Sequence, residues 1–152
     1  DKRGKYSVPL TYSEKDDALF SVPENLYLIG TMNTADRSLA IVDYALRRRF
    51  RFITLEPKFN SRFKEFLSSK GFSKDFIQEM TSKLNLLNAK IKTDKNLGAG
   101  FLIGHSFFCN ANSENERKWF ENIVKFEIRP LLEEYWFDDS EKVDNEINLL
   151  LS

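Results

Sequence analysis

Apolar residues recur at intervals of three and four through most of the second half of the chain, a pattern typical of amphipathic helices. The longest example starts at Ser73 and keeps this spacing for about five turns. Shorter helices are predicted around Phe59–Leu67, ended by Gly71, and after Ser140. The apolar stripes comprise Phe59, Phe63, Phe66 and Leu67; Phe76, Ile77, Met80, Leu84, Leu87 and Ile91; and Val143, Ile147 and Leu150.

Helical spacing also returns at Glu114, with a proline inside the pattern. Pro130 cannot donate a backbone hydrogen bond, so it should kink this helix or open a new one. Residues 93–113 contain three glycines among apolar side chains, which favours a packed loop or short strand. The stripe of the helix after Glu114 comprises Phe120, Ile123, Val124, Ile128, Leu131 and Tyr135.

The first part of the chain has shorter apolar runs. Residues 1–25 are polar and interrupted by glycine and prolines, which indicates a long loop or hairpin outside the core. Leu26–Met32 is apolar on both alternating faces, as in a central strand, and Phe50–Leu55 predicts a second short strand. Between them, Ser38 can cap a helix that ends in an arginine run. Pro57 is the predicted boundary between an α/β part, residues 1–57, and a helical part, residues 58–152.

Composition is that of a folded, soluble protein. The 152 residues are 41% hydrophobic and 30% charged, and 14 of them are Phe, an excess expected inside. No apolar run reaches the roughly 18 to 20 residues of a membrane span and no signal peptide is evident, so a cytoplasmic protein is predicted. The chain begins at Asp1 without an initiator Met, which suggests a fragment.

The chain has one cysteine and one histidine, which limits disulfide and metal-binding chemistry. With only Cys109 and only His105, neither an internal disulfide nor a multi-histidine metal site is possible. In its Phe-rich segment, His105 is predicted to be a hydrogen-bonded packing residue rather than a catalyst. Cys109 is predicted to be a small buried hydrophobe.

Charge is balanced overall but segregated locally. Lys and Arg number 23, as do Asp and Glu, yet residues 133–146 hold seven acids against one base. Residues 47–51 contain Arg47, Arg48, Arg49 and Arg51. Such arginines can complement a helix dipole, bind phosphodiesters, or reach a phosphate across a subunit interface. A solvated helix surface is the commoner explanation of such segregation, and composition alone does not choose among these alternatives.

The stretch after the first predicted strand places an amide, a carboxylate and a guanidinium at a strand end: Asn33, Asp36 and Arg37. Strand ends of α/β sheets are where ligands bind, and an amide or carboxylate there can orient an attacking water. The alternative is that Asn33 and Asp36 only satisfy turn amides. These 152 residues contain no phosphate-binding loop of the form GxxxxGK(S/T), and Gly98-Ala99-Gly100 is too short for a dinucleotide motif.

Two longer stretches carry a resemblance. Residues 22–38, VPENLYLIGTMNTADRS, and residues 42–50, VDYALRRRF, resemble the McrB family, the GTP-driven AAA+ motor subunits of modification-dependent (McrBC-type) restriction systems. Residues 103–108, IGHSFF, and residues 129–136, RPLLEEYW, are similar to the C-terminal part of that family. The resemblance implies an α/β remnant of an AAA+ nucleotide-binding core followed by a mostly α-helical lid domain.

The resemblance also implies roles for the candidate residues. Asn33 would be the sensor near the γ-phosphate and Asp36 would help place water. Arg48 and Arg49 would act at the neighbouring subunit's nucleotide, and Arg37 would support that interface. The intact parent would use GTP and Mg²⁺, whereas no cofactor is expected in the isolated fragment.

The implied partners are identical subunits in a ring, a McrC-like nuclease subunit, and DNA through the full complex, with no membrane. Two alternatives stay open: a non-enzymatic nucleic-acid-binding module that uses the arginine run, and a helical interaction module without a ligand. Steeply salt-dependent DNA binding by the chain would favour the first alternative.

Overall fold

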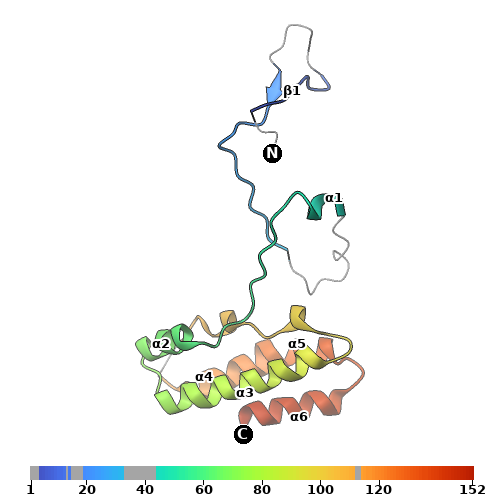
Figure 1. Cartoon of the computed structure of the whole chain (residues 1–152). Coiled ribbons are helices and arrows are strands. Elements are labelled where there is room, and N and C mark those ends of the chain that lie inside the picture. Colours follow the sequence, from blue (N-terminus) through green and yellow to red (C-terminus); the bar gives the residue numbers. More distant parts are fainter. Residues whose placement is uncertain (1–3, 13, 15–18, 33–43, 112–113) are drawn as a thin grey trace. The chain divides into compact units, whose positions relative to one another are not determined.

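The computed structural model describes residues 4–12, 14, 19–32, 44–111 and 114–152. The chain divides into two compact units, Asp1–Met32 and Asn33–Ser152 (Figure 1). Most of the helix predicted to start at Ser38 lies outside the described residues. Its expected end is seen as α1 (Tyr44–Arg47), which stops where the arginine run begins.

The first unit contains a small antiparallel hairpin. Strand β1 (Ser7–Val8) pairs with β2 (Phe20–Ser21), with Ser7 opposite Ser21. Gly4 has a φ of 68°, a conformation that favours glycine, and its amide donates to the Val22 carbonyl at 2.8 Å. All four strand residues are exposed, so the prediction of a hairpin outside the core is confirmed for the described part of residues 1–25.

The two strands predicted at Leu26–Met32 and Phe50–Leu55 are absent, and those predictions are wrong for this structure. Among the described residues, β1 and β2 form the only sheet. The side chains of Ile29 and Leu55 are 95% and 91% exposed. A strand needs a neighbouring strand to bond its amides and a covering layer to bury its faces. Among the described residues no strand pairs with either segment, and the side chains of both segments are exposed.

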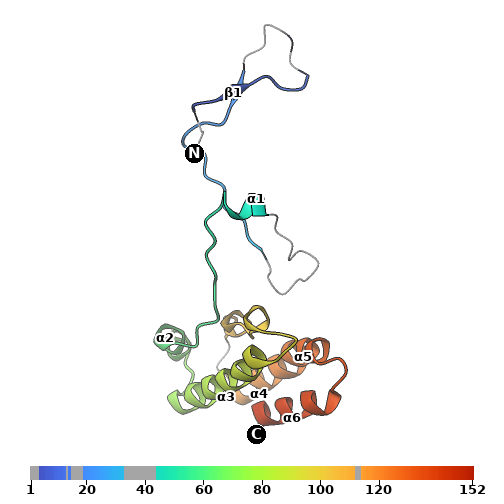
Figure 2. The same cartoon turned by 45° about the vertical axis from the view of Figure 1, so that its right-hand side comes forward.

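The predicted helices of the second half are confirmed. They are α2 (Ser61–Ser69), α3 (Lys74–Thr93), α4 (Glu116–Ile123), α5 (Arg129–Tyr135) and α6 (Ser140–Leu151). Helix α3 packs against α2 and α6, and α6 also packs against α5 (Figures 1 and 2). The irregular stretch between α3 and α4 includes two short 3₁₀ helices, η2 (Ala99–Phe101) and η3 (His105–Phe108).

Side-chain caps fix where three of the helices start. The side chains of Asn60, Asn115 and Asp139 accept hydrogen bonds from the first-turn amides of α2, α4 and α6 at 3.0 to 3.2 Å. Ser73 precedes α3 as predicted, but its side chain does not cap that helix. Its backbone amide and hydroxyl instead donate to the Glu116 carboxylate at 2.7 and 2.8 Å, which ties the start of α3 to the start of α4.

The hydrophobic core of the described residues lies entirely between Phe59 and Leu150. Its aromatic part consists of interlocking phenylalanines whose ring centroids lie 5.4 to 6.5 Å apart, mostly edge to face. The phenylalanine excess is only partly internal, because Phe126 and Phe137 are exposed. The buried phenylalanines are Phe59, Phe63, Phe72, Phe76, Phe108 and Phe120.

A wide turn lets the helix run through Pro130. Residues Val124–Ile128 form a π-helical turn, η4, in which the Arg129 amide donates to the Val124 carbonyl five residues back. Proline lacks the amide of a regular α-helical turn and its ring crowds the carbonyl four residues earlier, so a wider turn relieves both conflicts. The turn also moves the buried stripe: Leu132 is fully buried, whereas Leu131 of the predicted stripe is only half-buried.

Candidate functional site

The arginine run forms a set of exposed guanidiniums. Arg47 ends α1, Arg48 and Arg49 occupy the turn that follows, and Arg51 stands in the next extended segment. All four residues are exposed, and none forms an ion pair with another described residue. Exposed guanidiniums at the end of a helix are suited to bidentate contact with phosphate oxygens.

The other predicted site residues lie outside the part of the chain that the structure describes. Asn33, Asp36 and Arg37 lie outside the described residues, which stop at Met32 and resume at Tyr44. Their roles therefore stay predictions.

His105 has the structural setting predicted for it. Its Nδ1 accepts a hydrogen bond from the Lys58 backbone amide at 3.2 Å, and its ring lies edge-on to Phe63 with centroids 6.1 Å apart. Cys109 differs from its prediction, because it is exposed. Phe108 takes the inward position at the end of η3, so the next residue in this tight turn faces solvent.

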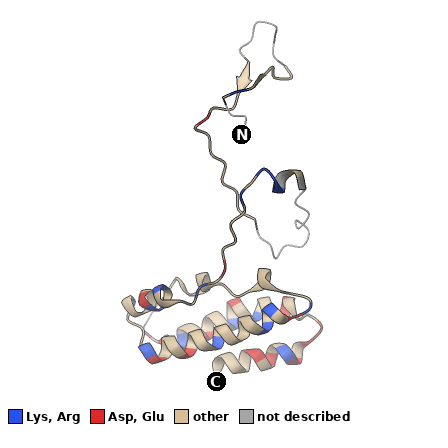
Figure 3. Ribbon diagram, in the orientation of Figure 1, with Lys and Arg blue, Asp and Glu red and all other residues tan. Residues whose placement is uncertain are grey.

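Three of the seven acids in residues 133–146 form ion pairs with basic residues of the helices. Glu133 and Asp144 both receive hydrogen bonds from Arg129, at 2.8 and 2.6 Å, and Glu146 pairs with Lys90 at 2.6 Å. Figure 3 shows acidic and basic residues interspersed along these helices. The acidic segment thus joins helices to one another, which agrees with the structural explanation of the pattern rather than with a nucleic-acid surface there.

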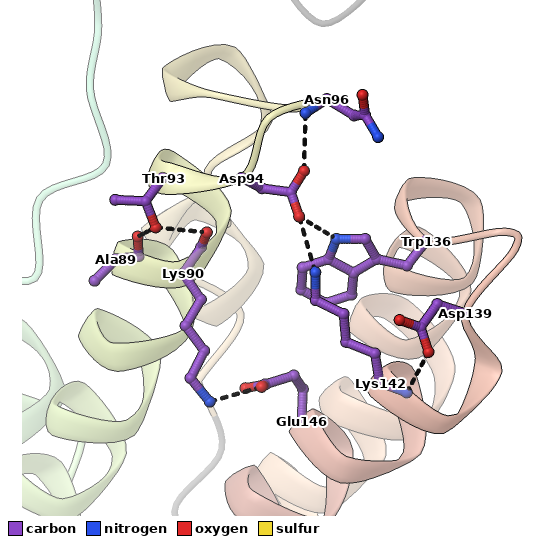
Figure 4. A network of polar contacts seen from close by, with 9 residues as sticks. All are labelled: Ala89, Lys90, Thr93, Asp94, Asn96, Trp136, Asp139, Lys142 and Glu146. Atoms are coloured by element: carbon purple, nitrogen blue, oxygen red, sulfur yellow. Dashed lines mark hydrogen bonds and ion pairs between the residues drawn. The ribbon is translucent and has the colours of Figure 1, made fainter.

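A polar network around Asp94 was not anticipated from the sequence. Asp94 follows the last residue of α3, and its carboxylate accepts hydrogen bonds from the Asn96 amide, the Trp136 indole and the Lys142 ammonium at 2.8 to 2.9 Å (Figure 4). The Lys142 ammonium also lies 4.2 Å from the Trp136 ring centroid, as in a cation–π contact. The network fastens the C-terminal end of α3 to the start of α6.

The hydrogen bond from Lys142, followed by those from Asn96 and Trp136, lowers the pKa of Asp94 from 3.8 to about 2. A carboxylate whose pKa is lowered on folding stabilises the fold above its unfolded pKa, and this contribution is lost as pH falls through the folded value. The relevant window is thus between about pH 4 and pH 2.

Replacing Asp94 with Asn is expected to lower the free energy of unfolding by about 1 to 2 kcal/mol at pH 7. The variant should also lose less stability than the wild type between pH 4 and pH 2. Urea unfolding followed by circular dichroism at a series of pH values measures both effects. Asp138→Asn, at an exposed position in the connection between α5 and α6, is the control. An equal loss in that variant would contradict a specific role for the Asp94 network.

Among the described residues, no three His, Cys, Asp or Glu side chains are grouped so as to hold a metal ion. No helix among the described residues is long and apolar enough to cross a membrane.

A known protein family matches the helical part of the chain. The family model described as "McrB, alpha-helical lid domain" matches residues 79–144, which extend from α3 into α6. Helices α4 and α5, with parts of α3 and α6, therefore match a helical lid domain, in agreement with the helical lid that the sequence predicts.

The relatives extend the match to the rest of the chain. The "Type IV methyl-directed restriction enzyme EcoKMcrB subunit" of Escherichia coli K12 is 52% identical over 157 residues, which cover 99% of this chain and 34% of that protein. The "Type II restriction enzyme BsuMI component YdiS" of Bacillus subtilis 168 is 26% identical over 163 residues, covering 95% of this chain and 43% of that protein. The chain belongs to the McrB family and spans about a third of the length of its Escherichia coli relative.

Proposed function

We propose that these residues form the C-terminal part of a GTP-hydrolysing AAA+ motor subunit that drives DNA translocation and cleavage in modification-dependent restriction. Residues 1–57 would end its α/β core and residues 58–152 would be its lid. The observation that carries the proposal is the 52% identity, over nearly the whole chain, to a subunit of a methyl-directed restriction enzyme. The longer protein that contains this sequence is called the parent below.

The exposed apolar segments support the core assignment. Leu26–Met32 and Phe50–Leu55 keep the composition of buried strands while their side chains face solvent. Burying large apolar side chains stabilises a fold by roughly 1.5 to 3 kcal/mol each, so such segments favour a covering partner. Upstream residues of the parent, forming the rest of a sheet, would provide that partner.

In this proposal the nucleotide lies between subunits. Asn33 is the sensor at the γ-phosphate, Asp36 places the attacking water, and Arg37 supports the interface. Arg48 and Arg49 reach the nucleotide of the neighbouring subunit, for which their exposure is suited. GTP and Mg²⁺ are held mainly by upstream residues of the parent.

The proposed partners are identical subunits in a cytoplasmic ring, a McrC-like nuclease subunit, and DNA bound through the full complex. The naming of both relatives as parts of restriction enzymes supports a multi-subunit setting. A nuclease partner would supply the cleavage chemistry.

The exposed arginines also favour one alternative, a nucleic-acid-binding module without catalysis. The two functions differ in what the 152 residues do alone. Binding of this chain to duplex DNA that weakens steeply with added salt would favour the module.

Replacing Asn33 or Asp36 with Ala in the parent tests the proposed function directly. Each substitution is expected to lower kcat for GTP by on the order of 10²-fold while the Kd for GTP changes much less, because a group that positions water acts mainly in the transition state. Steady-state turnover and equilibrium titration with a non-hydrolysable GTP analogue measure the two quantities. Equal losses in both would indicate a folding role, and a wild-type parent without nucleotide hydrolysis would refute the proposal.

The 152-residue chain by itself is expected to bind GTP weakly or not at all. It lacks a phosphate-binding loop, and with it the amides and lysine that hold a triphosphate. Titration calorimetry with GTP and Mg²⁺ measures this, with the parent as the positive control. Micromolar binding by the short chain would show that the nucleotide site has been assigned to the wrong residues.

A further inference from the structure

We propose that His105 is a positioning residue that fixes the direction of the chain where it enters the lid, and that it does so by holding the Lys58 backbone amide. The effect of this contact on GTP turnover rests on the proposed function, because the contact lies where the lid joins the segment that carries Arg48 and Arg49. The contact itself does not depend on that function.

The contact joins parts of the chain that are 47 residues apart. The Lys58 amide donates to Nδ1 of His105 at 3.2 Å, which requires a lone pair on that nitrogen and places the ring proton of neutral His105 on Nε2. The edge-on contact with Phe63 of α2 keeps the ring in place. Phe63 of α2 thus orients the His105 ring, and the ring accepts a hydrogen bond from the backbone of Lys58.

The histidine is mounted on a fixed part of the lid. Two residues before it, the Ile103 backbone is held from both sides by the Asn88 side chain of α3, at 2.7 and 3.0 Å. Three residues after it, Phe108 is fully buried in the aromatic cluster. His105 therefore connects the Lys58 backbone to the interior of the lid.

The chain on the other side of the contact is stiff. Pro57 fixes its own φ and biases Glu56 toward an extended conformation. Immediately after Lys58, Phe59 is buried against Phe63 and Phe108. Lys58 is thus the joint between a restricted extended segment and an anchored aromatic residue, and His105 holds that joint.

This arrangement gives the lid a means of setting the position of the arginines. In the proposed motor, residues 50–55 lead from the arginine run to Pro57. Loosening the joint would misplace Arg48 and Arg49 relative to the neighbouring phosphate, and small misplacements of a transition-state contact lower kcat more than they change KM.

The first arm of the test is amide hydrogen exchange in the 152-residue chain, which needs no catalysis. His105→Phe keeps a ring against Phe63 but removes the acceptor, and it should speed exchange at the Lys58 amide by about tenfold or more. His105→Asn offers its Oδ1 near the position of Nδ1 and should restore protection, whereas His105→Gln, which resembles the Nε2 side, should not. The Phe63 amide, bonded to Asn60, is the internal control and should not change.

The second arm is GTP turnover by the parent. His105→Phe should lower kcat by about 3- to 10-fold with KM within about twofold, and His105→Asn should recover most of the loss. The proposal is overturned if the Lys58 amide of the His105→Phe variant exchanges at the wild-type rate. It is also overturned if His105→Asn loses as much kcat as His105→Phe. A parent that hydrolyses no nucleotide refutes the proposed function instead, and the exchange arm still decides whether His105 holds Lys58.

Discussion

Replacing Arg49 with Ala in the parent is expected to lower GTP turnover by on the order of 10³-fold, because a guanidinium at a subunit boundary neutralises charge that develops on a neighbouring γ-phosphate. Arg48→Ala is expected to act in the same direction. Arg51→Ala is the matched control, since it removes an exposed arginine of the same run. Similar losses in all three variants would indicate a general electrostatic surface, as in the nucleic-acid-binding alternative.

Mixing variants decides whether Arg49 acts on its neighbour. A parent with Arg49→Ala and a parent lacking its phosphate-loop lysine should each be nearly inactive alone. Mixed rings should recover turnover wherever an intact arginine faces an intact nucleotide pocket. If rings demonstrably mix and turnover does not return, the arginines act within their own subunit or on the DNA path, and the assignment in trans is wrong.

Replacing Asn88 with Ala is expected to lower the free energy of unfolding by about 3 to 4 kcal/mol, because two buried backbone groups lose their partner at about 1 to 3 kcal/mol each. The Asn88 amide both donates to and accepts from the Ile103 backbone. Ile103 is 1% exposed and Asn88 is 9% exposed, so water cannot easily replace the lost bonds.

Urea unfolding of the 152-residue chain measures this effect. Asn85→Ala, on the exposed side of the same helix, is the control and should change stability by no more than about 0.5 kcal/mol. Asn88→Leu tests whether filling the space is sufficient, and it should remain destabilised because the Ile103 groups stay unpaired. A cost for Asn88→Ala equal to that of Asn85→Ala would contradict the role of this side chain.

The sequence predicts the helices of the lid well because each one buries a stripe within the chain. Ile77, Leu84 and Ile91 repeat at seven-residue intervals along α3, and all three are buried. The strands could not be predicted in the same way, since a strand is completed by backbone elsewhere. The composition of Leu26–Met32 is that of a buried strand, but no strand of the described residues pairs with it.

Other differences arise where tertiary structure overrides local pattern. The π turn before Pro130 rotates the rest of the helix, so the buried stripe passes through Leu132 and Trp136 instead of Leu131 and Tyr135. Asn88 lies within an apolar stripe of α3. The only sequence feature that indicates its structural role is a polar residue at a core position. Of the candidate site, Arg48 and Arg49 are exposed, and the roles of all five residues, Asn33, Asp36, Arg37, Arg48 and Arg49, stay predictions.

The location of the core between Phe59 and Leu150 determines what a calorimeter records from this chain. The heat capacity change of unfolding arises from apolar surface newly exposed to water, and many apolar side chains before Phe59 are already exposed. About 12 to 15 cal/mol/K per residue then applies mainly to the lid, roughly three fifths of the chain. A lower melting temperature therefore reports a change in lid packing, and an arginine variant that keeps the wild-type melting curve keeps the packed lid.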